Sequence, residues 1–235
     1  MRPDQVGLVF EEVHLKRFFK HFAVDCVFDV GANKGQYRNM LRTRVGYTGP
    51  VISFEPIPEL AAELRARAAE TSNWYIEEVA LDENVGVRPF NIMAGDQFSS
   101  LREPSHEDVD IFRDTNEIVR IVEVEVSTLA VHYAKYFDKL GFRNAFLKLD
   151  TQGNDLRAVE GAGDAISNFI GLQSELSIRR IYDQTSDIHA ALPFYQSKGF
   201  ELSALVPNNA GHFPRLIEID CIMFRSDAIA GMQPD

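Results

Sequence analysis

The most restrictive feature of the sequence is an alternation, beginning at residue 24, of short apolar runs with segments of helical periodicity. Apolar runs at 24–30, 51–54 and 74–81 predict strands, and the segments 35–44 and 58–71 between them predict helices. Such an alternation builds right-handed βαβ units, whose strands pair in parallel and are covered by helices on both faces. The chain is therefore predicted to be an α/β protein.

The alternation is interrupted at residues 84–126, where strand patterns at 85–90 and 118–126 flank a polar stretch. We interpret this segment as a β insertion. Its stretch 97–111 would form either a lid over a ligand site or the wall of a site for an acceptor substrate. A disordered acidic loop is the alternative. The alternation then resumes, with helices expected at 128–139, 154–165 and 187–198 and strands at 145–149 and 170–176.

The last two apolar runs, 200–206 and 216–224, are separated by PNNAGHFPR, which is too short for a crossover helix. These strands must therefore pair antiparallel. We expect about seven strands in a mostly parallel sheet with an antiparallel last strand. The expected organisation is a lead-in helix within residues 1–23, a main domain at 24–226 that contains the insertion, and a tail at 227–235.

The segment VFDVGANKG places Gly31 and Gly35 where the first strand ends and the next helix begins. In open α/β sheets, ligands bind outside the carboxyl ends of the strands. Glycine lets the backbone approach a ligand closely, and the helix that follows offers unpaired N–H groups. Residue 33 is Asn, so the spacing departs from the G-x-G-x-x-G pattern of dinucleotide-binding proteins. This departure weakens the case for NAD as the ligand.

Two acids accompany this turn. Glu55 follows the second strand in the segment SFEP, where a carboxylate can accept two hydrogen bonds from a ribose diol. Asp29 precedes Gly31 by two residues and either holds an ammonium group or braces the turn. Taken singly, such features arise from backbone geometry or helix capping. In this order and spacing, they favour a ligand with a ribose at one end and an amino acid at the other, namely S-adenosylmethionine.

The charge balance agrees with a cationic ligand. Lys and Arg number 24 and Asp and Glu number 35, which gives a net charge of −11. Such a chain repels polyphosphate and anionic lipid, so we expect neither nucleic acid nor a membrane surface as a partner. Cys26 and Cys221 lie in apolar runs and read as core residues, and the N-terminus shows no leader pattern. A soluble, cytoplasmic protein is expected.

A set of segments then carries a resemblance to a known family. In chain order they are FDVGANKGQY, SFEP, EEVALDENVG, SSL, LKLDTQGNDLRAVEGA, LSIRRIY, YQSKGFEL and EID. They resemble the FkbM family of S-adenosylmethionine-dependent methyltransferases over about residues 24–224. The resemblance implies a class I methyltransferase (Rossmann-like) fold and O-methylation of hydroxyl groups on sugars or natural products.

The resemblance also implies roles for individual residues. It assigns Asp29, Gly31, Asn33 and Gly35 to the methionine end of the donor, Glu55 to the ribose, and Ala80 and Leu81 to the adenine slot. The chain departs from the family pattern at Asp155, where Glu is frequent. A role that needs the longer side chain is therefore in doubt.

The candidate catalytic residues follow two neighbouring strands. Asp150 ends the run FLKLD, beside the first strand and thus beside the donor methyl; it either lines the active site or, with Thr151, caps the next helix. Transfer to an alcohol requires a base or a metal that lowers the pKa of the hydroxyl. Asp150 is our first candidate base, and Glu175 is the second. The two could share a cation, but no metal-ligand cluster appears in the sequence, so no metal is predicted.

The histidines are weaker candidates. His106, His189 and His212 fall in segments that could overhang the pocket, but none follows a strand or stands at a recognisable spacing from an acid. We expect them at the surface.

Three functions remain open at this level: a small-molecule O-methyltransferase, a non-catalytic binding subunit of the same fold, and a nicotinamide oxidoreductase. The first is favoured, with a small-molecule or glycan hydroxyl as the acceptor. Loops that would select the acceptor carry no substrate signature. A homodimer through the N-terminal helix or the insertion is a further expectation.

Overall fold

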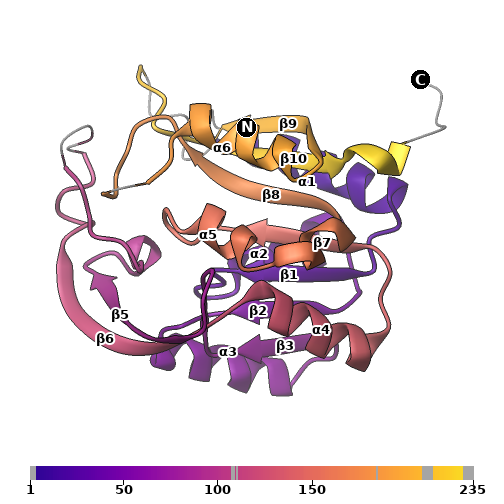
Figure 1. The fold of residues 1–235 in the computed structure, drawn as a ribbon, viewed down its shortest axis with the longest axis horizontal. Coiled ribbons are helices and arrows are strands. Elements are labelled where there is room, and N and C mark those ends of the chain that lie inside the picture. The colour runs from indigo at the N-terminus through magenta and orange to yellow at the C-terminus, as the bar shows by residue number, and fades with distance from the viewer. Residues whose placement is uncertain (1–3, 107–108, 110, 184, 208–213, 230–235) are drawn as a thin grey trace.

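The computed structural model describes residues 4–106, 109, 111–183, 185–207 and 214–229, and its main sheet has seven strands. In chain order these are β1 (Cys26–Val30), β2 (Val51–Phe54), β3 (Trp74–Glu77), β7 (Ala145–Leu149), β8 (Phe169–Ser177), β9 (Phe200–Pro207) and β10 (Glu218–Arg225). Their order across the sheet is β3-β2-β1-β7-β8-β10-β9 (Figure 1). Strand β10 runs antiparallel to β8 and β9, whereas the other neighbours pair in parallel. This architecture confirms the expected sheet.

Helices cover both faces of the sheet. One face carries α1 (Asp4–His21), α2 (Gln36–Met40), the π-helical turn η1 (Leu41–Val45) and α3 (Pro58–Ala69). The other carries α4 (Leu129–Leu140), α5 (Asp155–Glu160), the 3-10 helix η3 (Gly163–Asn168) and α6 (Ile188–Ser197). Short 3-10 helices also occur at η2 (Asp96–Phe98) and η5 (Ser226–Ile229).

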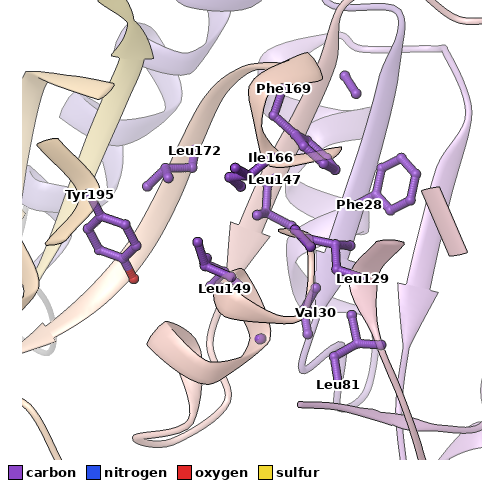
Figure 2. Close-up of a cluster of buried hydrophobic side chains, with 14 of the residues drawn as sticks. Phe28, Val30, Leu81, Leu129, Leu147, Leu149, Ile166, Phe169, Leu172 and Tyr195 are labelled. Atoms are coloured by element: carbon purple, nitrogen blue, oxygen red, sulfur yellow. The ribbon is translucent and has the colours of Figure 1, made fainter. Parts of the chain in front are cut away.

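The alternating side chains of the central strands divide the core in two. Phe28, Leu147 and Phe169 pack beneath α4 and α6 in the cluster drawn in Figure 2. On the opposite face, Val27 and Phe146 pack against α1, from which Phe18 lies 5.3 Å from the Phe146 ring. Burial on both faces explains why these strands read as nearly continuous apolar runs.

The face beneath α1 and α2 also carries a buried polar row. Ser53, Asp29, Lys148 and Gln173 occupy matching registers on β2, β1, β7 and β8. Ser53 donates to Asp29 Oδ2 at 3.1 Å and accepts from Trp74 Nε1 at 3.0 Å. The row crosses β2, β1 and β7 one residue before each of these strands ends, and therefore lies just beneath the carboxyl edge of the sheet, where ligands bind in folds of this kind.

The insertion forms a second sheet. Strands β4 (Ala80–Leu81), β5 (Gly86–Met93) and β6 (Ile118–Ser127) pair in the order β4-β6-β5, and Figure 1 shows β5 and β6 extending away from the main sheet. The predicted strand 74–81 is therefore wrong as one element. It breaks after Glu77 because Ala80 leaves the main sheet and packs with Phe90 and Val126 of the small sheet.

The predicted helix 154–165 is also divided. The α-helix ends at Glu160, and η3 begins at Gly163, whose backbone is left-handed with φ +50°. The predicted helix 35–44 becomes α2 followed by η1. Among the described residues, no helix has both the length and the apolar character needed to cross a bilayer.

Candidate active site

A cavity of about 460 Å³ opens at the carboxyl ends of β1, β2, β7 and β8. The insertion contributes Phe90 and Leu101 to its walls, and α1 contributes Leu8 and Glu11. The structure brings together, along this cavity, the predicted site residues Gly31, Asn33, Glu55, Ala80, Leu81, Asp150 and Glu175. Asp29 and Gly35, the remaining two, are not among its lining residues.

The turn after β1 is built on left-handed backbone. Gly31, Asn33 and Gly35 have φ values of +77°, +47° and +76°. A Cβ on Gly31 would lie 1.8 Å from the carbonyl oxygen of Asp150, so this position requires glycine for space as well as for conformation. Gly35 differs, because a Cβ there would meet Trp74 and Leu64 at 3.0 and 3.1 Å. Gly35 therefore packs the turn onto the core.

Glu55 is tied to this turn. Its Oε2 accepts the backbone N–H of Asn33 at 2.7 Å, and its Oε1 accepts that of Ile57 at 2.9 Å. Each carboxylate oxygen has a second lone pair, with which it can accept a hydrogen bond from a ligand hydroxyl. Burial raises the pKa of Glu55 to about 7, although the two N–H donors oppose the increase. A single carboxylate thus fixes the turn and faces the cavity.

Asp29 lies beneath the turn and is fully buried. Its Oδ1 is 3.7 Å from Nζ of Lys148, which in turn lies 3.4 Å from the Gly31 carbonyl oxygen. Burial lowers the pKa of Lys148, but the carboxylates of Asp150 and Asp29 raise it by more. These contacts favour the bracing role for Asp29 over direct contact with an ammonium group. Lys148 itself was not predicted, although a lysine inside the apolar run FLKL is a recognisable signal.

Asp150 and Glu175 face the cavity from neighbouring strand ends. Asp150 Oδ2 pairs with Lys148 Nζ at 3.2 Å, and Asp150 Oδ1 accepts from Gln152 Nε2 at 2.7 Å. The same Nε2 donates to Glu175 Oε2 at 3.0 Å. The Asp150 carboxylate bonds to Lys148 and Gln152, and the N-cap of α5, Asn154, makes no side-chain capping hydrogen bond. Thr151 Oγ1 accepts the N–H of Asn154 and donates to Asp155. Asp150 is therefore a wall of the cavity.

Further acids complete this wall and were not predicted. Glu218 and Asp220 reach the cavity from β10, and Glu11 reaches it from α1, where Gln173 Nε2 donates to Glu11 Oε1 at 2.8 Å. Burial together with Asp150 and Asp155 raises the pKa of Glu218 to about 7. Among the described residues that line the cavity, Lys148 is the one cation. The alternation of two acids with apolar residues in EIDCIMF could have indicated this wall, since acids in a covered strand need a polar neighbour.

The opposite end of the cavity is apolar. Ala80 and Leu81 are buried there, with Phe54, Ile57 and Phe90 as neighbours along the lining. Asn154 Nδ2 donates to the Leu81 carbonyl oxygen at 3.0 Å, which ties this wall to the start of α5. The cavity therefore has an apolar end, a glycine turn with one carboxylate, and an acidic end.

Two of the three histidine candidates lie outside this cavity. His106 and His189 are not among its lining residues, and His212 lies outside the described residues. In the part of the chain that the structure describes, no group of three or more His, Cys, Asp or Glu side chains is arranged to hold a metal ion.

Because buried acids line the cavity, we expect the free energy of unfolding to fall as the pH rises. The pKa values of Glu55 and Glu218 stand at about 7 in the folded protein against an ordinary 4.5. Between pH 4.5 and pH 7 these two carboxyls keep their protons in the folded protein but lose them in the unfolded chain. Each carboxyl therefore lowers the free energy of unfolding by about 3 kcal/mol as the pH rises from below 4.5 to above 7. We expect urea denaturation to give a lower free energy of unfolding at pH 8 than at pH 5.

Glu218→Gln is the control for this pH dependence, because it removes one of the two carboxyls without changing its size. The slope of stability against pH should become shallower in this variant. Stability that rises from pH 5 to pH 8 in the wild-type protein would contradict the assignment.

Comparisons with known proteins show the family and the fold of this chain. The model of the methyltransferase FkbM domain matches residues 29–202, which is more than half of the chain. The structure of methyltransferase FkbM from Methylobacillus flagellatus KT is 16% identical, with a TM-score of 0.53 over 85% of this chain and 43% of that chain. This chain therefore spans less than half the length of the Methylobacillus protein. A search of curated proteins gave no match.

A second structure supports the fold. Magnesium protoporphyrin IX methyltransferase (ChlM) from Synechocystis PCC 6803, with bound SAH, is 8% identical, with a TM-score of 0.50 over 95% of this chain and 85% of that chain. At such identities the likeness concerns the class I methyltransferase fold, with its seven-stranded sheet and antiparallel end strand. The family-model match over residues 29–202 shows that this chain belongs to the FkbM family of S-adenosylmethionine-dependent methyltransferases.

Proposed function

We propose that the chain is an O-methyltransferase that transfers a methyl group from S-adenosylmethionine to a hydroxyl of a small molecule, sugar or natural product. One observation carries the proposal: a single cavity joins the Gly31 turn and Glu55 to the two carboxylates Asp150 and Glu175. The first pair suits a donor nucleoside, and the second suits removal of a proton from an alcohol.

The donor end is assigned from the contacts described above. The turn at Gly31 and Asn33 holds the methionine part, because both residues line the cavity where β1 ends. Glu55 accepts the ribose hydroxyls, and Ala80 and Leu81 form one side of the adenine slot. Gly35 and Asp29 act indirectly, by packing and bracing the turn.

The acidic end suits both the donor and the reaction. S-adenosylmethionine supplies a methyl group on a positively charged sulfur, and the carboxylates stabilise that charge. Asp150, with Glu175 as the second candidate, takes the proton of the acceptor hydroxyl as the new bond forms. Alignment of acceptor and donor within the cavity supplies much of the acceleration, since the sulfonium is a good leaving group.

Replacing Glu55 by alanine tests the donor assignment. The variant loses charge-assisted hydrogen bonds to the ribose, so the affinity for S-adenosylmethionine should fall about 10- to 100-fold in isothermal titration calorimetry.

A ligand control separates this loss from damage to the turn, because Glu55 also accepts the N–H of Asn33. S-adenosylhomocysteine should bind wild-type protein more tightly than its 2′-deoxyribose analogue does. Glu55→Ala should bind the two ligands equally. Equal binding by the wild-type protein would refute the ribose contact, and binding without turnover of any hydroxylated acceptor would favour a non-catalytic subunit.

A further inference from the structure

Gln152 stands in the turn after β7 with a backbone conformation that its side chain type rarely adopts. Its φ is +55°, in the left-handed region, and the next residue is Gly153 at φ +91°. A non-glycine residue held in that region has a conformational cost and needs contacts that fix it. Ser100 supplies one of them, because its Oγ donates to the Gln152 carbonyl oxygen at 2.7 Å.

The side chain of Gln152 joins the two candidate bases. Its Nε2 carries two hydrogens and lies 2.7 Å from Asp150 Oδ1 and 3.0 Å from Glu175 Oε2. At its other end, Oε1 accepts from the hydroxyl of Tyr182 at 2.8 Å. Tyr182 is buried, and its hydroxyl also lies 2.8 Å from the Phe98 carbonyl oxygen. The buried tyrosine therefore orients the amide so that its donors face the carboxylates.

We propose that Gln152 is a positioning residue for methyl transfer, whose amide holds Asp150 and Glu175 in place and keeps Glu175 able to accept a proton. The proposal rests on the proposed function, because it assumes that these carboxylates are the bases. It assigns Gln152 a role through other residues and no contact with the reacting atoms.

Glu175 stands among several other acids. Acids approach it from three elements, namely Glu218 and Asp220 on β10, Asp150 at the end of β7, and Asp155 on α5. Burial, followed by the charges of these acids, raises the pKa of Glu175 well above its ordinary value. The ammonium of Lys148 pairs with Asp150 and Asp29, while Glu11 bonds to Gln173. An N–H donor at Glu175 opposes the effect of its acidic neighbours.

Two substitutions separate the amide from its backbone role. Gln152→Asn suits the left-handed backbone, which asparagine adopts more readily, but its amide is one methylene too short to reach both carboxylates. Gln152→Glu keeps the length and replaces the donors by acceptors. Gln97→Asn is the matched control, because Gln97 also lines the cavity but lies on η2.

The measurement is proton release on ligand binding, which needs no acceptor. Calorimetric titrations in buffers of different ionisation enthalpy, between pH 5.5 and 9, give the protons released on binding S-adenosylmethionine and S-adenosylhomocysteine. The difference isolates the effect of the sulfonium charge, which favours ionised carboxylates. We expect the pH window of this extra release to move up by about one pH unit in Gln152→Asn, the shift that corresponds to losing one hydrogen bond to a charged group.

The outcomes are distinct. Gln152→Glu should move the window in the same direction, so that either variant decides the case if the other fails to fold, and Gln97→Asn should leave it in place. Windows that coincide with wild type in the Gln152 variants, with or without a lower Tm, would reduce Gln152 to a structural residue. Wild-type protein that binds neither ligand would instead refute the proposed function, and this proposal with it.

Discussion

Replacing Gly31 by alanine is expected to destabilise the protein by about 4 kcal/mol and to abolish binding of S-adenosylmethionine. The added Cβ would lie 1.8 Å from the carbonyl oxygen of Asp150, and the backbone has φ +77°. The turns after β1 and β7 must then move apart. This movement breaks the hydrogen bond that the Asp150 N–H donates to the Val30 carbonyl oxygen. Urea denaturation and calorimetric titration measure the two effects.

Gly46 provides the matched control. Its φ is +80°, almost that of Gly31, but a Cβ there would meet nothing within 4 Å. Gly46→Ala should therefore cost about 1 to 2 kcal/mol, the penalty of the left-handed conformation alone, and leave binding intact. If the two alanine variants lose equal stability, the close approach of the β1 and β7 turns does not determine the residue at position 31.

Replacing Lys148 by methionine is expected to cost about 3 to 5 kcal/mol at pH 7, because the change leaves Asp29 buried without its cation. The loss should shrink as the pH falls from 8 to 5. Burial already raises the pKa of Asp29, and without Lys148 the carboxyl escapes its unpaired charge by keeping a proton. Denaturation at pH 5 and pH 8 measures this difference.

The double variant Lys148→Met with Asp29→Asn tests the cause. It removes both members of the buried pair, so no buried carboxylate is left at position 29, and asparagine can still accept from Ser53. Asp150, the other partner of Lys148, has a side chain that is 39% exposed and stays solvated. The double variant should therefore be more stable than Lys148→Met alone. A double variant that is no more stable would mean that the alkyl packing of Lys148, and not its charge, supports the turn.

Local patterns were sufficient to predict most of the fold. Strands β1, β2 and β7 are covered on both faces, so their apolar runs were visible without knowledge of their neighbours. The antiparallel pairing of β9 with β10 followed from the short connection alone. The division of 74–81 into β3 and β4 could not be predicted, because it depends on the pairing of Ala80 with Val126 in the small sheet.

The position of a residue at the cavity could be predicted where its place on its own strand decides that position. Glu55 follows β2 directly, and it lines the cavity. Gly31 and Gly35, however, have nearly equal φ values of +77° and +76°. Their different roles follow from their neighbours, because Gly31 lies against the Asp150 backbone and Gly35 against the Trp74 side chain. The partnership of Asp29 with Lys148 depends on the register between β1 and β7, and that of Gln152 with Glu175 depends on side-chain placement. Neither is encoded in a local pattern.

The cavity takes its walls from both ends of the chain. Leu8 and Glu11 come from the first helix and Glu218 and Asp220 from the last strand, and both elements lie outside the residues 29–202 that match the family model. The walls of the cavity are complete only when these distant segments lie on the central strands, so a ligand that contacts all of them binds the fully assembled chain. By mass action, a bound ligand therefore opposes detachment of the first helix or the last strand as well as unfolding of the centre.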